Sequence, residues 1–155
     1  MKFRCAIVVC LFVSLLGTSP VYGDAAPLIE QQQNAEKIQT LLFKRRYGEV
    51  HQLITEYLQK WPDDLTGYFG MMILYQLQNF ENFDHRFDSQ FLRWHEKGRR
   101  LAVKVVNEGR SDPWQLFVAS GALGLSGMYR LNKRQTIRAL RDGSMAINAL
   151  KKAIK

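Results

Sequence analysis

Apolar residues recur every three or four positions along most of the chain, a spacing that places side chains on one face of an α-helix. The clearest example is the stretch 37–64, where one apolar stripe precedes a short turn at 46–48 and another runs from there to Pro62. Two short amphipathic helices cannot bury both stripes against each other alone, so further pairs must stack on them. The pattern therefore predicts an all-α protein built of stacked antiparallel helix pairs.

The same rhythm, punctuated by proline and glycine, divides the remaining chain into further helices. The helix expected at 66–78 is apolar nearly all round, which indicates burial between neighbours. The expected helix at 114–131 has a row of small residues, including Gly121, Gly124 and Gly127, that would allow a close approach of backbones. We expect six helices, beginning between 29 and 34 and ending near 45, and then at 48–60, 66–78, 88–108, 114–131 and 136–155.

The last of these helices carries an apolar stripe that can pack against the glycine-rich helix before it. Neither a glycine stop nor a proline follows it, although a terminal helix of a stacked array usually presents a polar outer face. We therefore expect that the natural chain continues, that this sequence is a fragment, or that a partner covers the last helix. The stripe consists of Ile137, Leu140, Ile147, Leu150 and Ile154.

The first 23 residues have the composition of a secretory signal peptide. Lys2 and Arg4 precede an apolar run at 5–17, which is shorter than the roughly 20 residues needed to span a bilayer. An uncleaved N-terminal anchor is the alternative. We expect an exported, periplasmic or secreted protein with a signal peptide at 1–23, a flexible lead at 24–30 and a helical domain at 31–155.

The net charge of +8 is concentrated near the C-terminus, where residues 130–155 include eight basic residues and one acidic residue. Four arginines recur at intervals of four, four and three, which predicts one basic helical face. Such a face could meet an anionic envelope surface, whether lipid, polymer or acidic protein, or it could simply be solvated. The predicted export argues against nucleic acid as the partner. The four residues are Arg130, Arg134, Arg138 and Arg141.

Residues suited to catalysis do not form a recognisable motif. His95 and Glu96 are not followed by the second histidine of a metalloprotease motif, and Ser120 and Ser126 lie outside any nucleophile-elbow pattern. One local cluster could ligate a metal, but a solvated acidic surface explains it as well. We therefore expect no enzyme activity, no cofactor and no metal. The cluster consists of Glu81, Asp84, His85 and Asp88.

Two groups of residues resemble a tetratricopeptide repeat, although Val50, Tyr57 and Met72 depart from the small residues usual in that family. Pro62 and Pro113 lie 51 residues apart, which corresponds to one repeat of about 34 residues and an insertion of about 17. The second half of a repeat is matched by Tyr47, Glu49, Leu58 and Pro62, and the first helix of the next by Tyr68, Met71 and Tyr75.

The resemblance implies a short right-handed solenoid that binds peptides or proteins on a concave side lined by the first helix of each pair. We therefore interpret the chain as a non-enzymatic protein-binding scaffold of the bacterial envelope or periplasm. The alternative is a peripheral membrane-surface protein that binds anionic lipid or polymer through the basic last helix. The partner and the oligomeric state stay open. The residues expected to line the groove are Leu42, Phe43, Phe69, Ile73 and Leu77.

Overall fold

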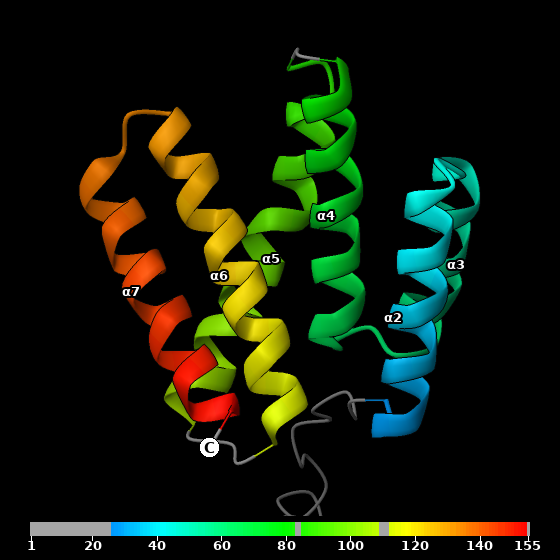
Figure 1. Ribbon diagram of the computed structural model, residues 1–155, viewed down its shortest axis with the longest axis horizontal. Coiled ribbons are helices and arrows are strands. Elements are labelled where there is room, and N and C mark those ends of the chain that lie inside the picture. Colours follow the sequence, from blue (N-terminus) through cyan, green and yellow to red (C-terminus); the bar gives the residue numbers. More distant parts are fainter. Residues whose placement is uncertain (1–25, 83–84, 109–111, 155) are drawn as a thin grey trace, which may run out of the picture.

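Six α-helices make up the regular secondary structure of the described residues, and no strand occurs among them. The computed structural model describes residues 26–82, 85–108 and 112–154, so the signal peptide predicted at 1–23 lies outside the described residues. The expectation of an all-α fold is confirmed. The helices are α2 (Leu28–Phe43), α3 (Tyr47–Lys60), α4 (Leu65–Asn82), α5 (Asp88–Asn107), α6 (Pro113–Asn132) and α7 (Thr136–Ala153) (Figure 1).

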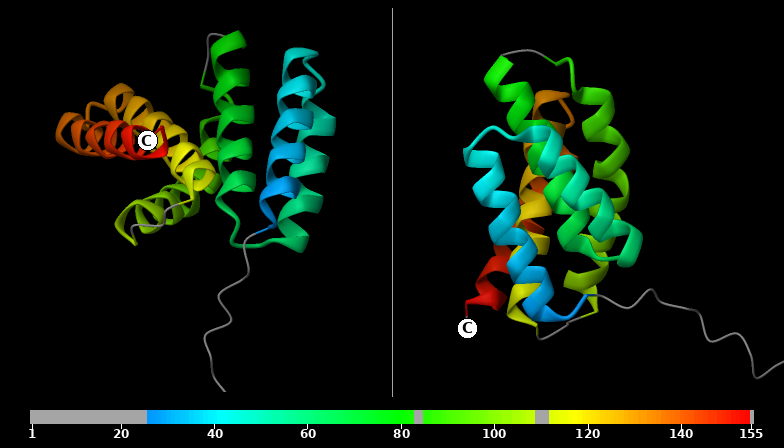
Figure 2. Two further views of the ribbon diagram at one scale, coloured as in Figure 1. Left: turned by 60° about the horizontal axis from the view of Figure 1, so that its bottom comes forward. Right: turned by 90° about the vertical axis from the view of Figure 1, so that its right-hand side faces the viewer.

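Successive helices pack in pairs, and the pairs stand side by side in chain order (Figure 1; Figure 2). The α4/α5 pair lies in the middle, because α4 contacts α2 and α3 on one side and α6 on the other. The α6/α7 pair forms one end of the stack and the α2/α3 pair the other. The first helices of the three pairs, α2, α4 and α6, therefore follow one another along one face.

The hydrophobic core consists of two clusters that meet at α4. Met71 belongs to the cluster shared with α2 and α3, whereas its neighbour Met72 belongs to the cluster shared with α5 and α6, and both side chains are fully buried. Because adjacent helical residues point about 100° apart, a helix buried on two sides needs apolar residues nearly all round. This confirms the expected burial of α4 between its neighbours.

The flexible lead predicted at 24–30 is wrong for its last three residues, since α2 begins at Leu28. Ala26 is buried, and its backbone amide donates a hydrogen bond to Oδ2 of Asp64 at 3.0 Å. Glu30 is also fixed, because its Oε1 accepts hydrogen bonds from Lys60 Nζ and Trp61 Nε1, each at 3.0 Å. These partners lie 30 or more residues further along the chain, so local composition does not reveal them.

The apolar stripe of the last helix does not pack against the glycine-rich helix, although the sequence allows this packing. Ile137, Ile147 and Ile154 are 85%, 58% and 76% exposed, whereas Ala139 and Ala149 on the other side of α7 are buried. Gly127 of α6 explains this choice. A methyl group at position 127 would lie only 3.3 Å from the carbonyl oxygen of Ala139, so the backbones approach too closely for large side chains to fit between them.

Candidate partner-binding groove

An open groove of about 930 Å³ runs along the face formed by the first helices of the three pairs. Its lining comes from α2, α4 and α6, together with Arg45 in the turn after α2. The second helices α3, α5 and α7 contribute none of the lining residues. All five residues expected to line a groove are part of this lining, namely Leu42, Phe43, Phe69, Ile73 and Leu77.

The floor of the groove is a ladder of three apolar side chains on α4. Phe69, Ile73 and Leu77 are spaced four residues apart and are all partly buried. Residues at this spacing are neighbours on a helix surface, with Cβ atoms about 5–6 Å apart. The ladder thus offers a partner three successive apolar contacts in a line.

The wall formed by α2 combines a core residue with an exposed aromatic residue. Leu42 is buried in the cluster shared with α3 and α4, although it also reaches the lining. Phe43 is 81% exposed at the C-terminal end of α2. Phe43 is therefore the better contact residue of the two, because replacing Leu42 would also disturb the core.

The wall formed by α6 was not anticipated from the sequence. Trp114, Phe117 and Val118 line it, and the rings of Trp114 and Phe117 lie 5.9 Å apart. Phe117 is half-exposed. Extending the rule that first helices line the concave side to the third pair would have indicated this wall, since these residues lie in the first helix of that pair.

The backbone of α6 supports the ladder from behind at Gly121. A methyl group at this position would overlap the ring of Phe69. By contrast, a methyl group at Gly124, less than one turn further along α6, would meet nothing within 4 Å. The position of the Phe69 ring therefore depends on a glycine that does not itself line the groove.

Hydrogen bonds between buried amides close the N-terminal end of the groove. Oε1 of Gln31 on α2 accepts a hydrogen bond from Thr66 Oγ1 on α4 at 3.3 Å and another from Gln115 Nε2 on α6. Gln31 and Gln115 are both buried. This network ties the beginnings of all three first helices to one another.

Charged side chains lie at the opposite end. Arg45 Nε and Glu81 Oε1 form an ion pair at 3.1 Å, and the hydroxyl of Tyr47 donates a hydrogen bond to the same carboxylate. Burial, together with this hydrogen bond, raises the pKa of Tyr47 to about 12, so the hydroxyl stays protonated at neutral pH. With Glu36 the only other charged lining residue, the groove presents mainly an apolar surface.

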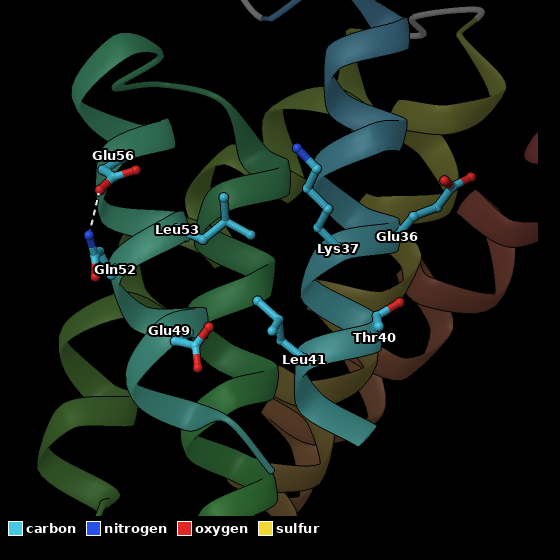
Figure 3. A pocket seen from close by; sticks show the side chains of 8 residues that line it. All are labelled: Glu36, Lys37, Thr40, Leu41, Glu49, Gln52, Leu53 and Glu56. Atoms are coloured by element: carbon cyan, nitrogen blue, oxygen red, sulfur yellow. Dashed lines mark hydrogen bonds between the residues drawn. The ribbon is translucent and has the colours of Figure 1, made fainter. Parts of the chain in front are cut away.

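A second, shallower hollow of about 580 Å³ lies between α2 and α3 (Figure 3). The partly buried Leu41 and Leu53 form its apolar part, whereas Lys37 and Glu49 are among the charged residues around it. The hydrogen bond in Figure 3 joins Gln52 Nε2 and Glu56 Oε1 on α3 at 2.9 Å. The mixed charges of this hollow do not favour any one class of ligand.

The four predicted arginines do not form one helical face, which corrects the sequence-based expectation. Arg130 is on α6 and only 14% exposed, and its Nε forms an ion pair with Oδ2 of Asp142 at 3.2 Å. Arg134 lies between α6 and α7 with a φ of 58°. Of the four arginines, only Arg138 and Arg141 lie on α7, where both are exposed. The prediction of one basic face was wrong because it continued the helical spacing across the turn between α6 and α7.

A buried polar network joins α5, α6 and α7. Ser126 donates a hydrogen bond to Oδ2 of Asp142 at 2.7 Å and lies 2.9 Å from Nε2 of His95. All three residues are buried. Because a carboxylate only accepts, the serine proton points to Asp142 and His95 Nε2 must carry the proton it donates to Ser126. The serine is thus held between two partners and inaccessible to solvent.

Residues of the acidic cluster considered as a metal site bind other side chains instead. Asp88 accepts hydrogen bonds from Lys133 Nζ at 2.9 Å and Asn79 Nδ2 at 3.0 Å, while Glu81 pairs with Arg45. Asp84 lies outside the described residues. The described part of the chain contains no group of three potential ligands placed to hold a metal ion.

Comparisons with known proteins do not identify a relative. No family model matches the chain, and no match emerges among curated proteins or solved structures. The tetratricopeptide resemblance therefore stays a prediction from the residues that carry it. Among the described helices, none combines the length and the apolar character needed to cross a membrane.

Proposed function

We propose that the protein is a non-enzymatic, tetratricopeptide-like scaffold that holds a peptide or protein segment in the groove between α2, α4 and α6. The observation that carries the proposal is the shared lining: three consecutive first helices direct apolar side chains into one open groove. The composition of residues 1–23 supports a location in the bacterial envelope or periplasm.

The chemistry of the lining favours a short amphipathic helix as the bound segment. Phe69, Ile73 and Leu77 provide contacts at the spacing of successive helical turns, and a helix laid in such a groove presents apolar anchors at the same interval. Phe43 and Phe117 stand on opposite walls, where aromatic side chains can enclose an anchor. The low charge of the lining makes apolar contacts the main source of affinity.

A peptide display library of random sequences tests this proposal for a partner whose sequence is unidentified. We expect the protein to enrich peptides with apolar residues at intervals of three and four. The substitution Ile73→Gln in the groove floor should lower the affinity for the enriched peptides tenfold or more, since a buried aliphatic anchor contributes about 1.5–3 kcal/mol to binding. Fluorescence anisotropy with labelled peptides measures the loss.

Leu92→Gln is the matched control, because Leu92 is a partly exposed aliphatic residue on α5 outside the groove lining. Circular dichroism and chemical denaturation of both variants establish that they are folded. Equal affinity of the enriched peptides for wild type and Ile73→Gln would refute the groove as the binding site. Failure to enrich any peptide would refute peptide binding by an isolated groove.

A further inference from the structure

The outer side of α7 is an exposed aliphatic stripe. In addition to Ile137, Ile147 and Ile154, Leu140 and Leu150 are exposed there, and the stripe extends over the turn to Leu131 of α6. Helix α7 has 18 residues, so the stripe extends for about 27 Å. Contiguous exposed apolar surface of this kind marks an interaction site more often than scattered apolar residues do.

The outward orientation of the stripe is fixed by the buried side of α7. Asp142 is fully buried, and its carboxylate accepts hydrogen bonds from Arg99 at 2.9 and 2.8 Å and from Ser126 at 2.7 Å. Turning α7 to bury its isoleucines would expose Asp142 and leave Arg99 and Arg130 without their carboxylate. The stripe is therefore a stable feature of the folded protein.

The charge around the stripe has one sign. Asp142 is the only acidic residue of α7, and it is buried and paired. Arg138, Arg141, Lys151 and Lys152 are all exposed on the same helix. At 100° per residue, Lys151 falls within the stripe, and Arg141 and Lys152 lie beside it, next to Ile137. A partner that covers this surface must accept aliphatic side chains and several positive charges together.

A second copy of the chain fits these requirements poorly. In a two-fold symmetric contact each surface meets its own copy, so antiparallel α7 helices would bring Arg141 of one copy near Lys151 and Lys152 of the other. A shaped protein partner is also disfavoured, since binding hot spots are rich in Trp, Tyr and Arg set in pockets. The stripe consists of aliphatic residues, and α7 contains neither Trp nor Tyr.

We propose that α7 docks on the surface of an anionic lipid bilayer, with the aliphatic stripe inserted at the boundary between headgroups and acyl chains. Helices that lie in this boundary combine an apolar face with Lys and Arg on the polar side. Arg141, Lys151 and Lys152, which lie within or beside the stripe, reach the phosphate groups. The apolar stripe, which carries the insertion, distinguishes this mode from contact through an arginine face alone.

Vesicle flotation of the full chain tests the proposal. Vesicles of phosphatidylcholine alone are compared with vesicles that also contain phosphatidylglycerol. We expect Ile147→Gln with Ile154→Gln to lower partitioning onto the anionic vesicles at least tenfold at any salt concentration. Arg141→Gln with Lys152→Gln should lower it about 30-fold at low salt and much less at high salt. Leu92→Gln, on α5, is the control and should match wild type.

A fluorescent probe separates α7 from any contribution of residues 1–23. With Cys5 and Cys10 replaced by serine, Ser144→Cys places one thiol on the exposed side of α7. An environment-sensitive dye there should shift to the blue with anionic vesicles only. The same shift with neutral vesicles, or no shift at all, would overturn the proposal. So would a dimer in analytical ultracentrifugation that Ile147→Gln dissociates while vesicle binding is absent.

Discussion

Arg99 on α5 and Asp142 on α7 form a doubly hydrogen-bonded ion pair between residues 43 apart in the sequence, with Nε–Oδ2 and Nη2–Oδ1 distances of 2.9 and 2.8 Å. Burial raises the pKa of Asp142, but the hydrogen bonds from Arg99 and Ser126 outweigh this effect and hold the pKa below its usual range. The carboxylate is therefore charged throughout the physiological pH range, and it connects the last helix to the rest of the stack.

Replacing Asp142 by asparagine should lower the free energy of unfolding by about 3 kcal/mol, because Arg99 and Arg130 lose their counter-charge in a largely buried position. Chemical denaturation measures the change. Asp63→Asn removes the partner of Lys97 in an exposed ion pair and should cost less than about 1 kcal/mol. Similar losses in the two variants would contradict the structural role of Asp142.

The stability of the protein should fall as the pH is lowered from about 6.5 to about 4. Burial, with Arg130 of α6 and Arg99 of α5 nearby, lowers the pKa of His95 to about 4, and the opposite effect of Asp142 of α7 is smaller. His95 is thus neutral in the folded state, whereas in the unfolded chain it takes up a proton below about pH 6.5.

The unfolded state therefore binds more protons than the folded state between about pH 6.5 and about pH 4. Lowering the pH through this interval should reduce the free energy of unfolding by up to about 3 kcal/mol. Denaturation midpoints measured across the interval report the slope. His95→Gln should flatten it, while His51→Gln, on the exposed side of α3, should leave it unchanged. A slope that survives in His95→Gln would assign the effect to other groups.

Alanine at two glycines of α6 should have opposite effects. Gly124→Ala places its methyl group in open space and should stabilise the protein by about 0.5–1 kcal/mol, the usual helix preference for alanine over glycine. Gly121→Ala should instead displace the ring of Phe69 and lower the affinity of the groove for peptides. Thermal unfolding and peptide affinity measured on both variants check this, and equal behaviour would show that Phe69 adapts without consequence.

Asp64 both caps α4 and fixes the start of the chain's first described helix. Its Oδ1 accepts a hydrogen bond from the backbone amide of Thr66 at 2.8 Å, while Oδ2 accepts one from Ala26. Asp64→Ala should cost about 2–3 kcal/mol, from the lost cap and the unsatisfied Ala26 amide. It should also increase hydrogen exchange at the beginning of α2.

Asp112→Ala provides the comparison. Among the described contacts, the side chain of Asp112 forms one hydrogen bond, which it accepts from the backbone amide of Trp114 and which caps α6. Its loss should cost about 1 kcal/mol and leave hydrogen exchange in α2 unchanged. If the two alanine variants were equally destabilised, the contact between Asp64 and Ala26 would have no measurable effect.

The helix bounds could be predicted from the sequence because their signals are local. Pro62 and the pair Asp112–Pro113 interrupt the pattern, and the observed starts of α4 and α6, Leu65 and Pro113, lie within one residue of those expected at 66 and 114. The start of α2 differs from the expected one for the opposite reason, since its stabilising partners lie far along the chain.

The orientation of α7 could not be predicted in this way. A periodic stripe shows that a helix has an apolar side but not whether that side faces the protein. Here Gly127 of α6 allows the backbone of α7 to approach closely at Ala139 and Gly143, and Asp142 pairs with Arg99 and Arg130, so the small and charged side is buried instead. Both facts depend on which helices become neighbours.

The five residues proposed for the groove lie together because one rule applies to α2 and α4 alike: the first helix of a pair faces the concave side. The contribution of Trp114 and Phe117 was missed, since the repeat register of the third pair is less regular than that of the second. Their role in binding, like that of the five, awaits the peptide measurements.

The hydrogen bond between Gln31 and Gln115 joins side chains 84 residues apart, and it links the first and third helix pairs directly. In Figure 1, α2 and α6 diverge from the end where these residues lie. A stack in which each helix pair contacts only its neighbours could bend along its whole length. Hydrogen bonds at the N-terminal ends of α2, α4 and α6 restrict this bending at one end of the groove, so we expect a long segment to be accommodated at the other end, toward Phe43 and Glu81.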